Sequence, residues 1–196
     1  TELTATEKLF EFRLIDERIR NAFRHQPGQF VELSIFGVGE APISISGSPT
    51  KQGFIELCVR RAGQFTQALH EMQCGDVVGI RGPFGRGFPY EAMKGHDVLF
   101  VAFEMWRHRK DFDLHLTVDN YEEGWDGEVG LVTKPFEHLE IDGTNTFGVV
   151  CGPPVMYRFV VEEMRKKGIP YDRIYMSFER HMKCGMGKCG HCQVGH

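Results

Sequence analysis

Long apolar runs and an excess of positive charge are both missing from this sequence. The longest apolar run, Val98 to Phe103, is far shorter than the roughly 18 residues of a membrane-spanning helix. The 23 Lys and Arg residues against 27 Asp and Glu residues give a formal net charge of −4, so binding to nucleic acid or to an anionic membrane is not expected. The first residues lack the basic and apolar parts of a signal peptide. We therefore expect a cytoplasmic protein.

Glycine and cysteine, by contrast, are abundant. Glycine accounts for 23 of 196 residues, about 12% against a usual ~7%. There are six cysteines, but a chain of this length can build its own apolar core and nothing marks it as secreted, so a disulfide framework is not expected. We expect a metal cluster and free thiols instead.

The first hundred residues are typical of short strands separated by turns. Apolar and polar residues alternate over residues 8–15, 29–36 and 53–60, and Pro and Gly residues lie between these stretches. A short helix over residues 65–72 would place Phe65, Leu69 and Met72 on one face. This pattern predicts a small antiparallel β-barrel over residues 1–93.

The pattern changes after about Gly95. Residues 97–102 and 146–151 are continuous apolar runs, typical of strands that are covered on both faces. A helix is predicted over residues 155–167, ended by Gly168 and Pro170. With further strands at 114–118 and 173–177, residues 94–178 predict a parallel α/β domain.

A cluster of cysteines near the C-terminus is the strongest motif. Cys184, Cys189 and Cys192 have the C-x4-C-x2-C spacing of the first three ligands of a plant-type [2Fe–2S] site, whose fourth cysteine lies further on. A zinc site completed by His191, His196 or a partner is the alternative, because zinc also prefers thiolate and imidazole ligands. We expect the iron–sulfur cluster, with its last ligand beyond His196.

Three further segments have the composition of ligand-binding loops. Residues 41–46 place hydroxyl groups on an extended segment, and residues 60–66 place Gly63 and Thr66 at a helix start, where free amides can bind a pyrophosphate. Residues 151–154 form a strand-to-helix turn at the carboxyl end of a strand, where ligands bind in open α/β sheets. A strand end with an N-cap, and a purely structural turn, are the alternative interpretations. The glycine-rich stretch 75–89 lacks the dinucleotide-binding fingerprint and is equally typical of a plain turn.

In this order, the motifs resemble the ferredoxin–NADP reductase superfamily. The resemblance extends over nearly the whole chain. More narrowly, the motifs resemble the electron-transfer subunit of class 1B dihydroorotate dehydrogenase, with the gamma subunit of sulfhydrogenases and the B subunit of anaerobic sulfite reductase as close relatives. Residues 177–192 are especially similar to these last two. It implies an N-terminal flavin-binding barrel, a C-terminal α/β nucleotide-binding domain and a small [2Fe–2S] lobe over residues 179–196.

The resemblance also implies site residues and a function. FAD would be held by residues between Pro42 and Thr66, a nicotinamide nucleotide by residues between Cys151 and Met156, and the cluster by the three clustered cysteines. The cofactors would do the chemistry. Electrons from NAD(P)H would pass through FAD and the cluster to a catalytic partner subunit, such as a dihydroorotate dehydrogenase, hydrogenase or sulfite reductase. The three groups are Pro42, Ile43, Ser44, Ile45, Ser46, Cys58, Val59, Arg60, Gly63, Phe65 and Thr66; Cys151, Gly152, Pro153 and Met156; and Cys184, Cys189 and Cys192.

Two departures from the family pattern bear on these expectations. Ala41 stands where the family usually has an arginine that pairs with a phosphate; Arg60, Arg61 or Arg86 would have to substitute. After Ala102 the family has a glycine-rich nicotinamide loop and further helices, roughly forty residues that the short stretch before Leu114 cannot hold, since one parallel crossover alone needs a dozen. A zinc-binding adaptor subunit without nucleotide chemistry is therefore the alternative function.

Overall fold

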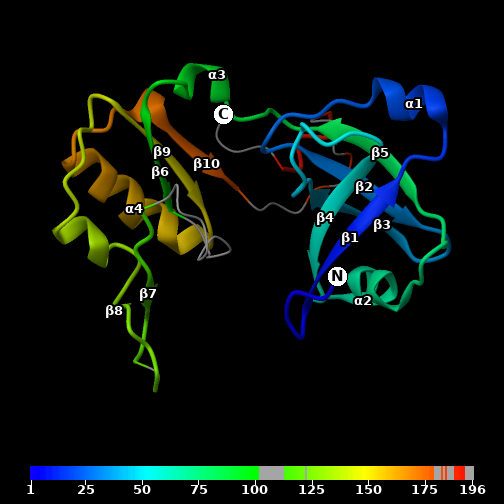
Figure 1. Cartoon of the computed structure of the whole chain (residues 1–196), viewed down its shortest axis with the longest axis horizontal. Coiled ribbons are helices and arrows are strands. Elements are labelled where there is room, and N and C mark those ends of the chain that lie inside the picture. Colours follow the sequence, from blue (N-terminus) through cyan, green and yellow to red (C-terminus); the bar gives the residue numbers. More distant parts are fainter. Residues whose placement is uncertain (102–112, 122, 179–181, 183, 185–187, 193–196) are drawn as a thin grey trace. The chain divides into compact units, whose positions relative to one another are not determined.

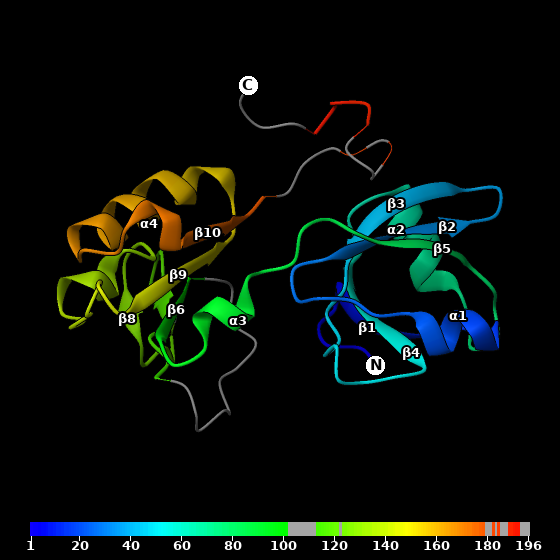
Figure 2. The ribbon, with the colours of Figure 1, turned by 90° about the horizontal axis from the view of Figure 1, so that it is seen from above.

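The computed structural model describes residues 1–101, 113–121, 123–178, 182, 184 and 188–192. The chain divides into two compact units, Thr1–Phe88 with Arg180–His196, and Pro89–Glu179, and Figures 1 and 2 show the elements of each. Among the described residues, no helix has both the length and the apolar character needed to cross a membrane.

The first unit is built on two antiparallel sheets. In one, β1 (Glu7–Arg13) pairs with β4 (Phe54–Arg60). In the other, β2 (Phe30–Ile35) lies between β3 (Gly39–Ser44) and β5 (Gly79–Phe84). The alternating sequence pattern thus predicted three of these strands correctly. A bridge between Ile45 and Leu57 joins the two sheets.

The core of this unit follows from the period-two pattern of its strands. Val31 and Leu33 of β2 and Ile55 and Leu57 of β4 are at most 1% exposed, and Leu69 of α2 (Gln64–Glu71) packs with them. Phe65 and Met72 pack against the same cluster, so the predicted helical face is confirmed. The helix α1 (Glu17–Ala22) has no buried residue; Asp16 caps it by accepting hydrogen bonds from Arg18 N and Ile19 N.

The second unit contains a parallel sheet, as predicted. Its central strand β9 (Thr146–Cys151) pairs with β6 (Asp97–Val101) and with β10 (Ile174–Ser177). The helix α4 (Pro154–Lys166) follows β9 and lies against the sheet (Figure 1). Its buried residues Tyr157, Val160 and Met164 join Val101 and Val150 in one cluster.

Two glycines allow this packing and the turn that follows. A Cβ atom on Gly148 in β9 would lie 2.5 Å from Met164 Sδ, so only glycine lets the helix approach this closely. Gly168 has φ +88°, and the turn closes α4 through hydrogen bonds from Gly168 N to Arg165 O and from Ile169 N to Met164 O. The helix therefore ends where Gly168 and Pro170 predicted.

Shorter elements complete the second unit. They are α3 (Tyr90–Met93), the two-residue parallel pair β7 (Thr117–Val118) and β8 (Glu128–Val129), and the 3₁₀ turns η1 (Lys134–Glu137) and η2 (Tyr171–Arg173). The strand expected over residues 114–118 is thus reduced to its last two residues, and within the described part of the chain it pairs with the equally short β8 alone. The segment expected to lack family residues begins at Ala102 and lies outside the described residues.

Candidate cofactor sites

The structure brings the expected flavin residues together from three elements of the first unit. Pro42, Ile43 and Ser44 lie on β3 and are followed by Ile45 and Ser46. Cys58, Val59 and Arg60 end β4, whereas Gly63, Phe65 and Thr66 belong to the start of α2. The bridge between Ile45 and Leu57 and two hydrogen bonds of 3.0 Å, from Ser46 N and Ser46 Oγ to Glu56 O, hold the end of β3 against β4.

Not all of these side chains face outward. Ser44, Ser46, Arg60 and Gly63 are exposed and available to a ligand. Val59, however, is only 2% exposed, and its carbonyl oxygen is 2.9 Å from His70 Nε2. Val59 therefore belongs to the apolar core, and only its neighbours on β4 offer side chains.

The start of α2 has the features of an anion site. Gly63 adopts an extended conformation, has open space around its Cα and offers no side chain to cap the first-turn amides. Thr66 Oγ1 accepts hydrogen bonds from Ala62 N at 2.9 Å and Gly63 N at 3.0 Å, which holds the loop in place. A helix N-terminus with uncapped amides attracts negative charge. Arg60 and Arg61 precede it, whereas Ala41 contributes no charge.

Burial keeps Cys58 chemically quiet. It raises the pKa of the Cys58 thiol above its usual value, and the nearby Glu7 carboxylate adds to this effect. The thiol therefore stays protonated at neutral pH, and the thiolate is the nucleophilic form. Cys58 can contact a ligand without reacting with it.

The expected nicotinamide residues lie at one edge of the parallel sheet. Cys151 ends β9, Gly152 and Pro153 form the turn, and Met156 lies in the first turn of α4, partly buried against the core. Cys151 pairs in register with Ser177, so the carboxyl ends of β9 and β10 meet here. This is the edge at which open α/β sheets bind ligands.

Tyr157 organises this edge, although the sequence pattern indicated only that it lies in a helix. Its hydroxyl donates to Ser177 O and accepts a hydrogen bond of 3.4 Å from Gly152 N. The side chain is 6% exposed and packs edge-on against Phe178. It thus ties the turn after β9 to the end of β10.

None of the three clustered cysteines forms a disulfide with a described residue. Cys184 and Cys192 are half-buried and Cys189 is exposed. Cys184 lies near Arg81, whose pKa is raised chiefly by its hydrogen bond to Glu40, with Cys184 adding to the effect. The three sulfur atoms do not all lie within 4.8 Å of one another.

The burial of the carboxylate residue Glu32 on β2 was not expected from the sequence. Glu32 lies between Pro42 and Arg81 in the register and is 2% exposed; its Oε1 atom has no hydrogen-bond partner. Burial, and then the Glu40 carboxylate, raise the pKa of Glu32, whereas Arg81 lowers it. Because successive side chains of a strand point to opposite faces, Glu32 lies on the face opposite the core residues Val31 and Leu33. From the sequence pattern alone, a glutamate on that face is expected to be exposed to solvent.

The fold, with antiparallel sheets in one unit and a parallel sheet in the other, defines a class of proteins, the reductases of the ferredoxin–NADP reductase type. The chain matches solved structures of an Amycolatopsis cytochrome P450 reductase (TM-score 0.71, 17% identity, 90% of this chain and 66% of that one) and of an NADH-dependent reduced ferredoxin-NADP oxidoreductase (TM-score 0.66, 23% identity, 97% and 78%). These likenesses show the fold.

Sequence comparisons show the family. Residues 1–89 match the oxidoreductase FAD-binding domain family. The chain is 35% identical to the sulfhydrogenase 2 subunit gamma of Pyrococcus furiosus (99% of this chain, 85% of that protein). It is 30% identical to a probable dihydroorotate dehydrogenase B (NAD(+)), electron transfer subunit, of Methanocaldococcus jannaschii (88% and 74%). The chain belongs to this family of FAD-binding electron-transfer subunits.

The alignment with the Pyrococcus furiosus protein is longer than this chain. It extends over 247 positions, whereas the chain has 196 residues, so at least 51 positions face no residue of this chain. This difference is in line with the expectation that the family has a segment that is absent here.

Proposed function

We propose that this chain is the electron-transfer subunit of a larger redox complex, which oxidises NADH or NADPH and delivers the electrons to a catalytic partner subunit. The observation that carries the proposal is the 35% identity to a sulfhydrogenase gamma subunit over 85% of that protein. When bound, FAD would accept a hydride from the nicotinamide, and a [2Fe–2S] cluster would carry the electrons onward singly.

The residues of the first unit fit a flavin dinucleotide. The open, uncapped N-terminus of α2 at Gly63 suits the pyrophosphate, and Thr66 holds the loop that presents its amides. The hydroxyl groups of Ser44 and Ser46 and the side chain of Arg60 are exposed toward solvent and can bind polar parts of the ligand. Arg60 and Arg61 supply the positive charge that Ala41 lacks.

The second unit would bind the nicotinamide nucleotide. Cys151, Gly152, Pro153 and Met156 are placed at the edge of the sheet that Tyr157 holds in shape. In this proposal these residues orient the nucleotide, and no side chain has to act as a nucleophile or general acid.

Cys184, Cys189 and Cys192 would supply three of the four cluster ligands. The Arg81 guanidinium near Cys184 favours the negative charge that a thiolate ligand carries. The fourth ligand is not among the residues that the motif supplies.

Anaerobic purification followed by absorption and electron paramagnetic resonance spectroscopy tests the proposal. We expect flavin bands, iron and sulfide in a ratio of one [2Fe–2S] cluster per chain, and bleaching on addition of NADH or NADPH. Affinity purification of the tagged chain from its native host is expected to recover a redox catalytic subunit. A colourless protein with one zinc ion bound by the cysteines and no response to either nucleotide would refute the proposal and support the adaptor alternative.

A further inference from the structure

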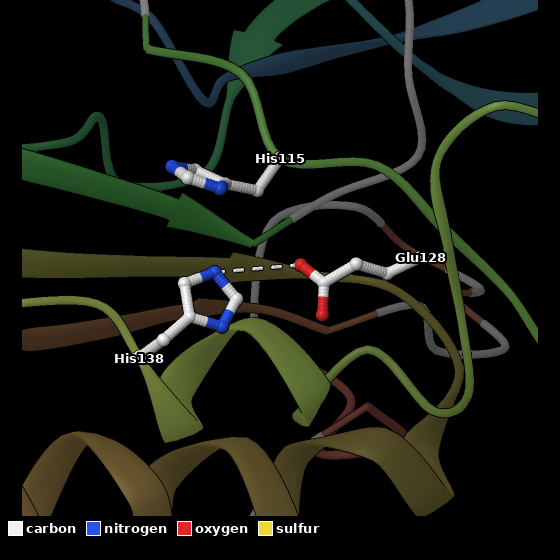
Figure 3. A group of neighbouring side chains, drawn as sticks. All are labelled: His115, Glu128 and His138. Atoms are coloured by element: carbon white, nitrogen blue, oxygen red, sulfur yellow. Dashed lines mark ion pairs between the residues drawn. The ribbon is translucent and has the colours of Figure 1, made fainter.

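The second unit holds a group of metal-ligating side chains that the cofactor sites do not use. His115 precedes β7, Glu128 lies on β8 and His138 follows η1. One potential ligand atom of each lies within 4.8 Å of the other two. Figure 3 shows the His138 imidazole facing the Glu128 carboxylate, with the His115 ring next to the His138 ring. Three segments of the chain thus converge on one point.

The distances are close to those of a bound transition-metal ion. His138 Nε2 lies 3.5 Å from Glu128 Oε1, and the two imidazole rings are 5.8 Å apart between centroids. Ligands at the Zn–N and Zn–O distances of about 2.0–2.1 Å lie roughly 3.3 Å from one another in a tetrahedron. The pair His138 and Glu128 has about this separation, and a ligand atom of His115 lies within 4.8 Å of both.

Local structure holds each ligand in place. Glu128 N donates to Leu116 O at 3.0 Å, and Thr117 pairs with Glu128 in the ladder, so the segments of His115 and Glu128 are joined. Trp125 Nε1 donates to Glu128 O at 3.0 Å. The position of His138 is set by the buried Pro135 and Phe136 of η1. The site is therefore built on paired or packed backbone rather than on free loops.

The charges around the group suit a divalent cation. Two neutral imidazoles and one carboxylate carry one negative charge. Asp113 Oδ2, 3.3 Å from His115 Nε2, adds a second carboxylate at the edge of the group, as is common beside metal-binding histidines. Lys134 is the cation that faces Glu128, and its ammonium group is paired with Glu137 at 2.6 Å.

We propose that His115, Glu128 and His138 bind one divalent transition-metal ion of the zinc type. Two imidazoles and one carboxylate are a ligand set that zinc uses with water in the fourth position, whereas hard cations such as Mg²⁺ prefer oxygen ligands alone. The bound ion joins the β7–β8 pair to η1 and leaves one coordination position open. This site is separate from the cysteine cluster and does not depend on the proposed electron-transfer function.

Titration of the full chain with Co²⁺ tests this proposal, because Co²⁺ reports its ligands spectroscopically. Cysteine ligation produces intense near-ultraviolet thiolate-to-metal charge-transfer bands, whereas nitrogen and oxygen ligands produce only weak visible d–d bands. We expect one saturable set of weak visible bands, which arises from nitrogen and oxygen ligands and not from thiolates. His138→Gln and Glu128→Gln each lower the affinity at least ~10-fold, since each removes one of three protein ligands.

Matched substitutions in the same unit control for non-specific effects. His96 and Glu140 are outside the group, so His96→Gln and Glu140→Gln leave the affinity unchanged. Thermal unfolding in EDTA shows whether each variant is folded. If a ligand variant fails to fold, proton NMR of the Co²⁺-loaded wild-type chain decides, since two paramagnetically shifted imidazole N–H signals are expected. Binding that shows only thiolate bands, equal losses in ligand and control variants, or no shifted imidazole signals would each overturn the proposal.

Discussion

Replacement of the buried Glu32 by glutamine is expected to stabilise the first unit at neutral pH. The side chain is 2% exposed, and Oε1 has no hydrogen-bond partner. Burial and the Glu40 carboxylate oppose its charge more than Arg81 favours it, so its pKa is raised above 4.5. Removing the charge without changing the shape of the side chain therefore removes an unfavourable interaction.

The magnitude follows from the cost of an unpaired buried group. A buried polar atom without a partner costs about 1–3 kcal/mol. Part of this cost remains in Glu32→Gln, because the amide also lies unpaired and Arg81 loses a negative neighbour. We expect a gain of about 1 kcal/mol, which for a folding unit of this size raises Tm by roughly 4–8 °C.

The pH dependence identifies the cause. The folded protein binds the Glu32 proton more tightly than the unfolded chain does, so this group makes the wild type less stable as pH rises from 4.5 through the raised pKa. The advantage of Glu32→Gln is thus largest at neutral pH and becomes smaller as the pH falls toward 4.5. Glu40→Gln has the opposite sign at neutral pH, because the hydrogen bond from Arg81 lowers the pKa of Glu40.

Hydrogen exchange measured by mass spectrometry on the peptide that contains β2 is the suitable assay. Trp125 lies in the second unit, so its fluorescence does not report on β2. Slower exchange of Val31 and Leu33 in Glu32→Gln at pH 7, with a smaller difference near pH 4.5, is expected. Faster exchange at pH 7, or the same difference at both pH values, would refute the reasoning.

Three further substitutions test the site and the fold. Thr66→Val removes the oxygen that accepts hydrogen bonds from Ala62 N and Gly63 N, and we expect it to raise the Kd of FAD, measured by calorimetry, up to ~10-fold. Thr66→Ser keeps the hydroxyl group and is expected to retain the affinity. Equal affinities of the wild type and both variants would contradict the role assigned to Thr66. Tyr157→Phe removes the hydroxyl that links Gly152 and Ser177 and is expected to lower the free energy of unfolding by about 1 kcal/mol. Urea unfolding followed by Trp125 fluorescence measures this change. Tyr171→Phe, at an exposed position, is expected to leave the free energy of unfolding unchanged. Gly168→Ala destabilises the same unit by about 1 kcal/mol because φ is +88° there; an unchanged urea midpoint would argue against this turn.

Local patterns predicted most of the regular structure. The alternation of apolar and polar residues located β1, β2 and β4, since every second side chain of these strands faces one core. Continuous apolar runs correctly indicated the parallel strands β6 and β9. The expected strand over 114–118 was largely wrong, because a strand needs a partner of matching length and β8 has only two residues.

The family and its motifs could likewise be identified from the sequence, because loops that bind cofactors have distinctive spacing of glycine, proline and cysteine. The assignment of individual residues to FAD, nucleotide and cluster remains a prediction. The position of Val59 in the core shows why spacing is not sufficient, since neighbouring residues of one strand point to opposite faces.

The sequence by itself determined the two-part organisation, the helix ends and the family, because these depend on residue periodicity, on glycine and proline and on short motifs. Only the tertiary structure decided which distant side chains meet. The burial of Glu32 beside Arg81, the link from Tyr157 to Ser177 and the convergence of His115, Glu128 and His138 each join residues at least 10 positions apart. Such contacts arise from strand pairing and packing, and no local pattern encodes them.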